Sequence, residues 1–216
     1  MNKAHILKQT QDFVQKKLGE DTSGHDWWHI HRVHQLAKKI AAQEGGDLFI
    51  IELAALLHDI SDWKFNGGDE HLGGKIAHQW LKDLGADTET CEKIETIINT
   101  LSFKGAKVTE KMASLEGQIV QDADRLDAIG AIGIARTFTY GGYKGRPMYQ
   151  PHIAPVLHES FEAYKNKTSH TINHFYEKML LLKDRMNTAT AKHLAKERHH
   201  FVEQYLAQFL QEWQGR

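Results

Sequence analysis

The sequence is poor in several features that define common classes of protein. Its 216 residues include one cysteine, Cys91, and three prolines. A single cysteine excludes an intrachain disulfide and a zinc site built from cysteines. The 27 Lys and Arg residues nearly balance the 28 Asp and Glu residues, so the formal net charge is -1. Without an excess of positive charge the chain has no broad electrostatic footprint for nucleic acid, and we expect no such partner.

Long apolar runs are also missing. The longest one, residues 48–57, is interrupted by Glu52 and is far shorter than the roughly 20 residues that span a membrane. The first eleven residues are polar and lack the apolar core of a signal peptide. We therefore expect no membrane partner and a cytoplasmic location. The apolar share of 41% and the charged share of 25% are close to the globular average, which argues against global disorder.

Apolar residues recur with helical spacing along almost the whole sequence. No segment alternates apolar and polar residues as a half-buried β-strand would. No proline occurs before residue 147, so none interrupts a helix there. Residues 47–60 are apolar nearly all round, which predicts a buried central helix. We interpret residues 1–216 as a single all-α domain, a helical bundle. The pattern predicts helices over 4–18, 28–44, 47–60, 71–84, 88–101, 111–139, 170–184 and 188–213.

Three segments between these helices are predicted to be loops: 61–70, 102–109 and 139–152. The third is the least regular stretch of the chain, since it combines three glycines and two prolines with Lys144 and Arg146. Loops of this length are usually functional or mobile.

Histidine is the residue in unusual supply, with 15 copies. It titrates near pH 7 and is the commonest metal ligand in proteins. At about 100° per residue, His29 falls in the apolar stripe of the helix predicted over 28–44. His31 falls on the solvent-facing side of that helix, and His34 falls at the border between the two sides. The inward His29 is therefore a candidate ligand. The alternative is a core histidine whose hydrogen bonds are satisfied within the protein.

The dipeptide His58-Asp59 ends the predicted central helix. Burying an ionised carboxylate there is costly unless a cation pairs with it. A divalent metal is one such cation, and the pair offers it a nitrogen and an oxygen ligand. In the alternative, His58 caps the end of the helix and Asp59 accepts hydrogen bonds from loop amides.

A further acidic cluster lies within the predicted helix 111–139. Asp124 and Asp127 share one ridge with Val120 and Ala131 because the four residues are spaced four, three and four apart. Burying two carboxylates on such a ridge costs free energy unless they bind a cation or accept strong hydrogen bonds. The alternative is a buried ion pair with Arg32 or Arg125. Together, His29, His58, Asp59 and Asp124 form a ligand set that suits a divalent metal, with positions left for water and substrate.

The order of these residues resembles the HD-domain superfamily of metal-dependent phosphohydrolases, in which one His, a His-Asp pair and a distant Asp lie on a helical bundle. The resemblance covers roughly residues 20–135 as an HD core, with a C-terminal helical extension over about 153–216. Residues 98–105 and 174–178 look like a bacterial branch of small stand-alone predicted hydrolases. The resemblance implies one divalent metal ion (Mn, Co, Ni or Mg) held by His29, His58, Asp59 and Asp124.

One metal is expected because members with two metals carry extra histidines on the two helices after His-Asp. His71 could supply one such ligand, but residues 91–101 contain no histidine. The resemblance further implies hydrolysis of a small nucleotide, a (deoxy)nucleoside triphosphate, by metal-activated water. Asp62 matches the position of a catalytic carboxylate in related nucleotide hydrolases, and its alternative role is that of an ordinary helix cap or loop residue. The predicted substrate-binding residues are Arg32, Lys64, Lys104, Asp127, Lys144 and Arg146.

Two other functions stay open at the level of sequence. One is a regulatory module that binds a nucleotide and a metal but turns nothing over, and the other is a nucleoside monophosphate phosphatase. A homodimer would be consistent with the apolar side chains of the last predicted helix, although these could equally pack on the domain itself. They are Phe201, Leu206, Phe209, Leu210 and Trp213.

Overall fold

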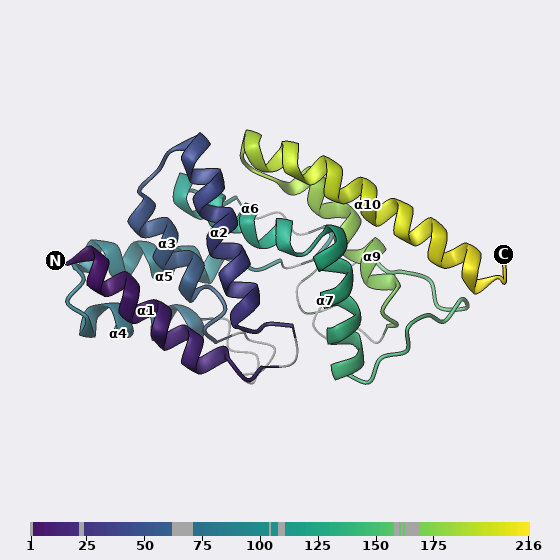
Figure 1. Cartoon of the computed structure of the whole chain (residues 1–216), viewed down its shortest axis with the longest axis horizontal. Helices are drawn as coiled ribbons and strands as arrows, with labels where there is room; N and C mark the ends of the chain where they lie inside the picture. Colours follow the sequence, from purple (N-terminus) through teal and green to yellow (C-terminus); the bar gives the residue numbers. More distant parts are fainter. Residues whose placement is uncertain are drawn as a thin grey trace. The chain divides into compact units, whose positions relative to one another are not determined.

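The computed structural model describes residues 2–21, 24–61, 71–103, 105–107, 111–157, 160, 162 and 169–216. Within these residues all regular secondary structure is helical and no strand occurs, so the all-α prediction is confirmed (Figure 1). The chain divides into two compact units, Met1–Ser102 with Glu110–Ala123 and Phe103–Thr109 with Asp124–Arg216. Each unit is described by itself, and the single-domain interpretation of residues 1–216 stays a prediction.

The helices of the first unit are α1 (Lys3–Leu18), α2 (Trp27–Glu44), α3 (Leu48–Leu57), α4 (Leu72–Asp83), α5 (Thr88–Leu101) and all but the end of α6 (Leu115–Asp127). Helix α3 is the centre of this unit, where it packs against α1, α2 and α5. Eight of its ten residues are buried, which confirms the predicted central helix. Helix α4 packs against α5.

Aspartates at the N-caps fix where three of these helices begin. The carboxylate of Asp26 accepts a hydrogen bond from the His29 amide at 2.8 Å, at the start of α2. Asp47 does the same for Phe49 at 2.9 Å, and Asp87 for Thr90 at 2.8 Å. Each bond satisfies an amide that has no partner within its helix. The cap of α2 thereby fixes His29 in the first turn of that helix.

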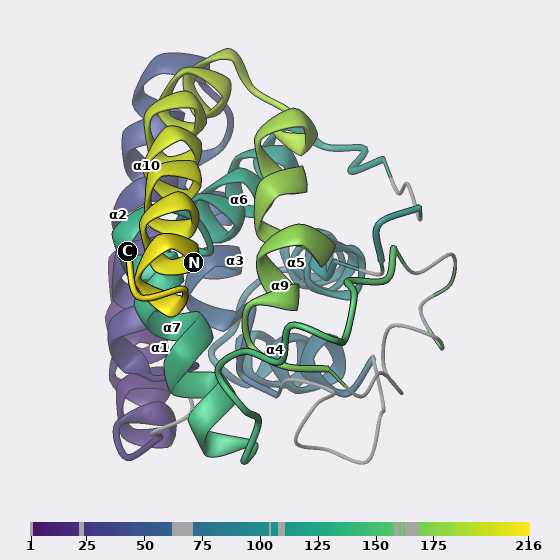
Figure 2. The same cartoon turned by 90° about the vertical axis from the view of Figure 1, so that its right-hand side faces the viewer.

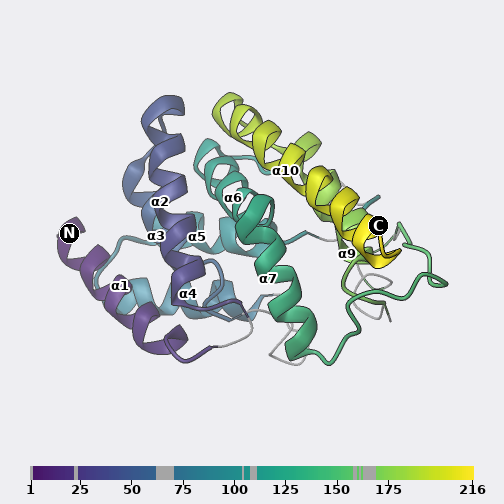
Figure 3. The same ribbon diagram turned by 45° about the vertical axis from the view of Figure 1, so that its right-hand side comes forward.

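The second unit contains α7 (Gly130–Tyr143), α9 (Asn173–Glu177), the 3₁₀ helix η2 (Met179–Arg185) and α10 (Ala189–Trp213). Helix α10 packs along α7 and η2, as Figures 2 and 3 show. Aromatic rings fill part of this packing: the ring of Phe175 stacks on Tyr205 with centroids 5.9 Å apart, and Phe138 lies near both. No described helix is long and apolar enough to cross a membrane.

The prediction of one helix over 111–139 is wrong. Helix α6 ends at Asp127 and α7 begins at Gly130, whose φ of +74° is a left-handed conformation that favours glycine. Arg198 of α10 donates a hydrogen bond to the carbonyl of Leu126, so this end of α6 has a partner from a distant part of the chain.

Two other predicted boundaries also change. The predicted loop over 139–152 begins later, because α7 continues to Tyr143. The predicted helix over 170–184 is replaced by the short α9 and the 3₁₀ helix η2.

Candidate metal centre

His29 lies in the first turn of α2, one turn after the capping residue Asp26, and its side chain is fully buried. The predicted inward orientation is confirmed. Its Nε2 atom lies 3.2 Å from Nε2 of His58. Two imidazole nitrogens therefore face each other between the start of α2 and the end of α3.

His58 is the C-cap of α3, and its Nδ1 atom lies 2.9 Å from the carbonyl oxygen of Ala55. A carbonyl oxygen only accepts, so Nδ1 carries the hydrogen and donates it. In the neutral ring Nε2 then holds the lone pair, which is the form that a metal ligand needs. The capping role considered at the sequence level is thus confirmed, and the same bond orients the other nitrogen toward His29 and Asp59.

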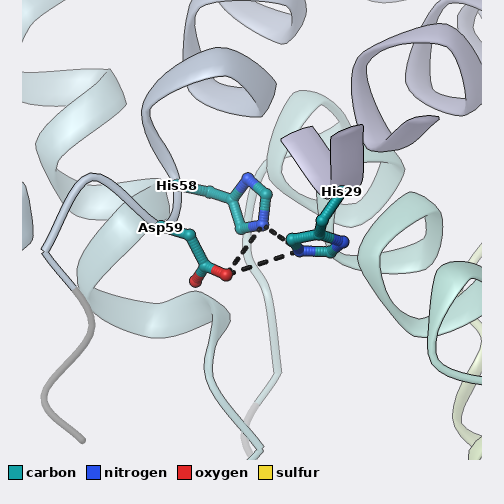
Figure 4. A group of neighbouring side chains, drawn as sticks. All are labelled: His29, His58 and Asp59. Carbon is teal, nitrogen blue, oxygen red and sulfur yellow. Dashed lines mark hydrogen bonds and ion pairs between the residues drawn. The ribbon is translucent and has the colours of Figure 1, made fainter. Parts of the chain in front are cut away.

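Asp59 completes a group of three side chains that point toward one another (Figure 4). Its Oδ2 atom lies 3.4 Å from Nε2 of His29 and 3.8 Å from Nε2 of His58. His29 and His58 are buried, and the side chain of Asp59 is 18% exposed. The group is therefore deep in the first unit but open at the carboxylate.

The spacing of these three atoms fits a bound divalent ion. Bonds of about 2.1 Å at a tetrahedral angle put two ligand atoms about 3.4 Å apart, and at a right angle about 3.0 Å apart. The three distances between the nitrogen and oxygen atoms are 3.2, 3.4 and 3.8 Å. Two imidazoles with one carboxylate suit borderline to hard divalent metals. Three ligands leave positions for water and substrate.

The electrostatics of the group keep Asp59 ionised. Burial raises the pKa of this carboxyl group, but the nearby His58 and hydrogen bonds from His25 and His29 outweigh burial and hold its pKa well below the usual range. A carboxylate that stays ionised is ready to bind a cation.

His25 is a member of the site that sequence reasoning missed. Its Nδ1 atom lies 2.9 Å from Oδ2 of Asp59, and its ring meets that of His29 edge-on with centroids 5.9 Å apart. His25 precedes the helix, where helical phase assigns no direction to a side chain. The available signal was its position four residues before His29 and directly before the capping residue Asp26.

The second unit contains several of the other predicted residues. Asp124 is half-buried at the end of α6, and its role as a fourth ligand stays a prediction. Asp127 is buried and forms an ion pair with Arg136 at 3.1 Å, whereas the alternative considered from the sequence named Arg32 or Arg125. Lys144 and Arg146 follow α7 and stand over the ring of Tyr140, at 5.7 and 5.6 Å from its centroid.

Arg32 is half-buried on α2, one turn after His29, and His71 is exposed at the start of α4. The predicted catalytic residue Asp62 and the predicted phosphate ligands Lys64 and Lys104 lie outside the described residues.

Comparison with known proteins decides the family. Residues 27–129 match the family model described as HD domain. The protein YpgQ of Bacillus subtilis is 40% identical over 209 residues, which cover 96% of this chain and 94% of YpgQ. The chain belongs to the HD-domain family. The chain is also similar to the crystal structure of an HD-superfamily hydrolase from Bacillus thuringiensis. The sequence identity is 45%, the match covers 100% of both chains, and the TM-score is 0.75.

Another solved structure is that of Bacillus subtilis YpgQ in complex with ADP, at 36% identity and a TM-score of 0.72, covering 95% of this chain and 97% of that chain. These relationships and the geometry of the site make this HD-domain protein a metal-dependent phosphohydrolase.

Proposed function

We propose that this phosphohydrolase acts on a small nucleotide, a (deoxy)nucleoside triphosphate, by attack of water on phosphorus. The observation that carries the proposal is the group of His29, His58 and Asp59, whose ligand atoms lie within 4.8 Å of one another. The crystal structure of YpgQ with ADP supports a nucleotide as the substrate class.

In this proposal His29, His58, Asp59 and Asp124 hold one divalent ion. When bound, such an ion lowers the pKa of a bound water molecule and polarises a phosphoryl oxygen. The residues of the chain prepare the site for it. The bond from His58 to Ala55 fixes which imidazole nitrogen faces the site, and Asp59 contributes a negative charge that neighbouring histidines keep in place.

The rest of the reaction needs a proton carrier and positive charges for the phosphates. We assign the proton transfer to Asp62, three residues after Asp59. Arg32, Lys64 and Lys104 are the proposed phosphate ligands. Lys144 and Arg146 join them in the proposal, because both cations gather at one aromatic ring, that of Tyr140.

The test is a screen of the purified protein, freed of metal with a chelator and resupplied with Mn, Co, Ni or Mg. Substrates are (deoxy)nucleoside tri-, di- and monophosphates, and the products are separated into inorganic diphosphate and single phosphate. We expect turnover of triphosphates with at least one metal. Nucleotide binding without turnover with any metal would favour the regulatory module, and turnover confined to monophosphates would favour the phosphatase.

A further inference from the structure

We propose that His25 is a positioning residue, which holds the carboxylate of Asp59 in the orientation needed to bind the metal ion. The proposal rests on the metal centre of the proposed function. It gives a role to a histidine that lies outside the predicted ligand set.

The bond between the two side chains is well formed. Nδ1 of His25 lies 2.9 Å from Oδ2 of Asp59, at the usual length for a hydrogen bond between a nitrogen and a carboxylate. An ionised carboxylate only accepts, so His25 must donate from Nδ1. Both side chains are 18% exposed, so water competes little for either partner.

The local sequence explains why His25 reaches this carboxylate. Asp26 has an extended backbone, with φ -82° and ψ 174°, and caps α2 by accepting from the His29 amide. His25 is the residue directly before that cap. The cap therefore sets the direction from which the chain enters α2, and the ring of His25 comes to lie edge-on to that of His29.

Asp59 needs such support because no helix fixes it. Helix α3 ends at Leu57, and Asp59 follows the capping residue His58. Of the three histidine nitrogens near Oδ2, Nδ1 of His25 is nearest, at 2.9 Å against 3.4 Å for His29 and 3.8 Å for His58. The bond from His25 thus restrains the carboxylate beside the two imidazoles before any ion arrives.

Holding the Asp59 carboxylate in place should raise the affinity of the site for the metal. A carboxylate that is already oriented loses little rotational freedom when it binds an ion, whereas an unrestrained one must be ordered at that moment. Removal of the groups that orient metal ligands typically costs about 10–100-fold in metal affinity. We expect a loss in this range when the donor at Nδ1 of His25 is removed.

The experiment is a calorimetric titration of the metal-free full chain with Mn²⁺. Three variants separate the possible roles of the side chain. His25→Ala removes the donor. His25→Asn keeps a donor close to the position of Nδ1, because the amide nitrogen of asparagine lies at the same distance from Cβ. His25→Gln moves its amide nitrogen out to where Nε2 of the imidazole would lie.

The matched control is His78→Asn. His78 makes the same kind of bond, from Nδ1 to Oε2 of Glu95 at 2.7 Å, between α4 and α5 and outside the three-ligand group. The His78→Asn substitution removes a histidine and alters an imidazole–carboxylate pair elsewhere in the same unit. Circular dichroism and thermal melting of every variant report whether the helices are intact.

The proposal expects the dissociation constant for Mn²⁺ to rise about 10–100-fold in His25→Ala and His25→Gln, and to stay near the wild-type value in His25→Asn and His78→Asn. Wild-type affinity in a folded His25→Ala would overturn the proposal. Affinity in His25→Asn as poor as in His25→Ala would overturn it too, since His25 would then act as an imidazole ligand. A wild-type chain that binds no divalent ion would instead contradict the metal centre itself.

Discussion

At the scale of single residues, His58 and Asp59 show that a capping role and a ligand role need not exclude each other. His58 satisfies the carbonyl of Ala55 at the end of α3 with one ring nitrogen and presents the other to His29. The same hydrogen bond that ends the helix selects the ring nitrogen that faces the site. Helix termination thereby places the ligand.

His58→Ala and Asp59→Ala are expected to abolish metal binding and hydrolysis while leaving the helices intact. Each substitution removes one of the three ligand atoms that lie within 4.8 Å of one another. Metal content after dialysis, turnover and far-ultraviolet circular dichroism check the prediction. Unchanged turnover in either variant would refute the assignment of the site.

The affinity for metal is expected to fall as the pH is lowered from 8 to 5.5. An imidazole nitrogen must be free of its proton to bind a metal, so protons compete with the ion for histidine ligands as the pH falls. Asp59 does not contribute, because its pKa lies well below its usual range and the carboxylate stays ionised throughout. Titrations with Mn²⁺ across the range check this, and a constant affinity down to pH 5.5 would argue against histidine ligands.

At the scale of elements, the start of α2 shows how a local capping signal positions a residue of the metal site. Its cap follows from the short polar residue Asp26 before an apolar-periodic run, and the sequence signal for it is strong. The aspartates Asp26 and Asp87 cap α2 and α5 with hydrogen bonds of the same length, 2.8 Å. Only the first supports a predicted metal ligand.

Asp26→Ala and Asp87→Ala are therefore expected to differ in one property. Each is expected to lose stability, because removing a cap leaves a helix amide without its hydrogen-bond partner, and denaturant unfolding measures the loss. Only Asp26→Ala should also weaken the binding of Mn²⁺, since its cap holds the first turn that carries His29. Equal metal affinities in the two variants would show that the cap has no part in placing the site.

The break between α6 and α7 is the boundary that the sequence pattern did not reveal. Apolar spacing continues across it, and one partner of the last turn of α6, Arg198, lies 72 positions beyond Leu126 along the chain. A local pattern carries no information about such a contact.

Substituting Gly130→Ala is expected to lower the thermal midpoint of unfolding. The residue has φ +74°, and for an L-residue the left-handed region costs roughly 1–2 kcal/mol. A Cβ atom there would also lie 3.1 Å from the side chain of Arg198. The matched control is Gly142→Ala in α7, where an added Cβ meets nothing within 4 Å. A midpoint as high as that of the control would contradict the strained conformation.

At the scale of the whole molecule, the pattern of apolar residues was enough to predict an all-α chain and the buried helix α3. Helical phase and the His58-Asp59 pair were enough to select three residues that the fold brings together. His25 was missed because it precedes its helix and bonds to a residue 34 positions away. The proposed substrate-binding residues come from several segments of the chain, and helical spacing within one segment does not predict which of them lie close together.

In the proposed function, the group of His29, His58 and Asp59 holds the one ion that hydrolysis requires. The decisive measurement is triphosphate turnover while Mn²⁺ is added stepwise to the metal-free protein. We expect no turnover without metal and an activity that stops rising at one ion per chain. Turnover without any divalent ion, or a requirement for two firmly bound ions, would contradict it.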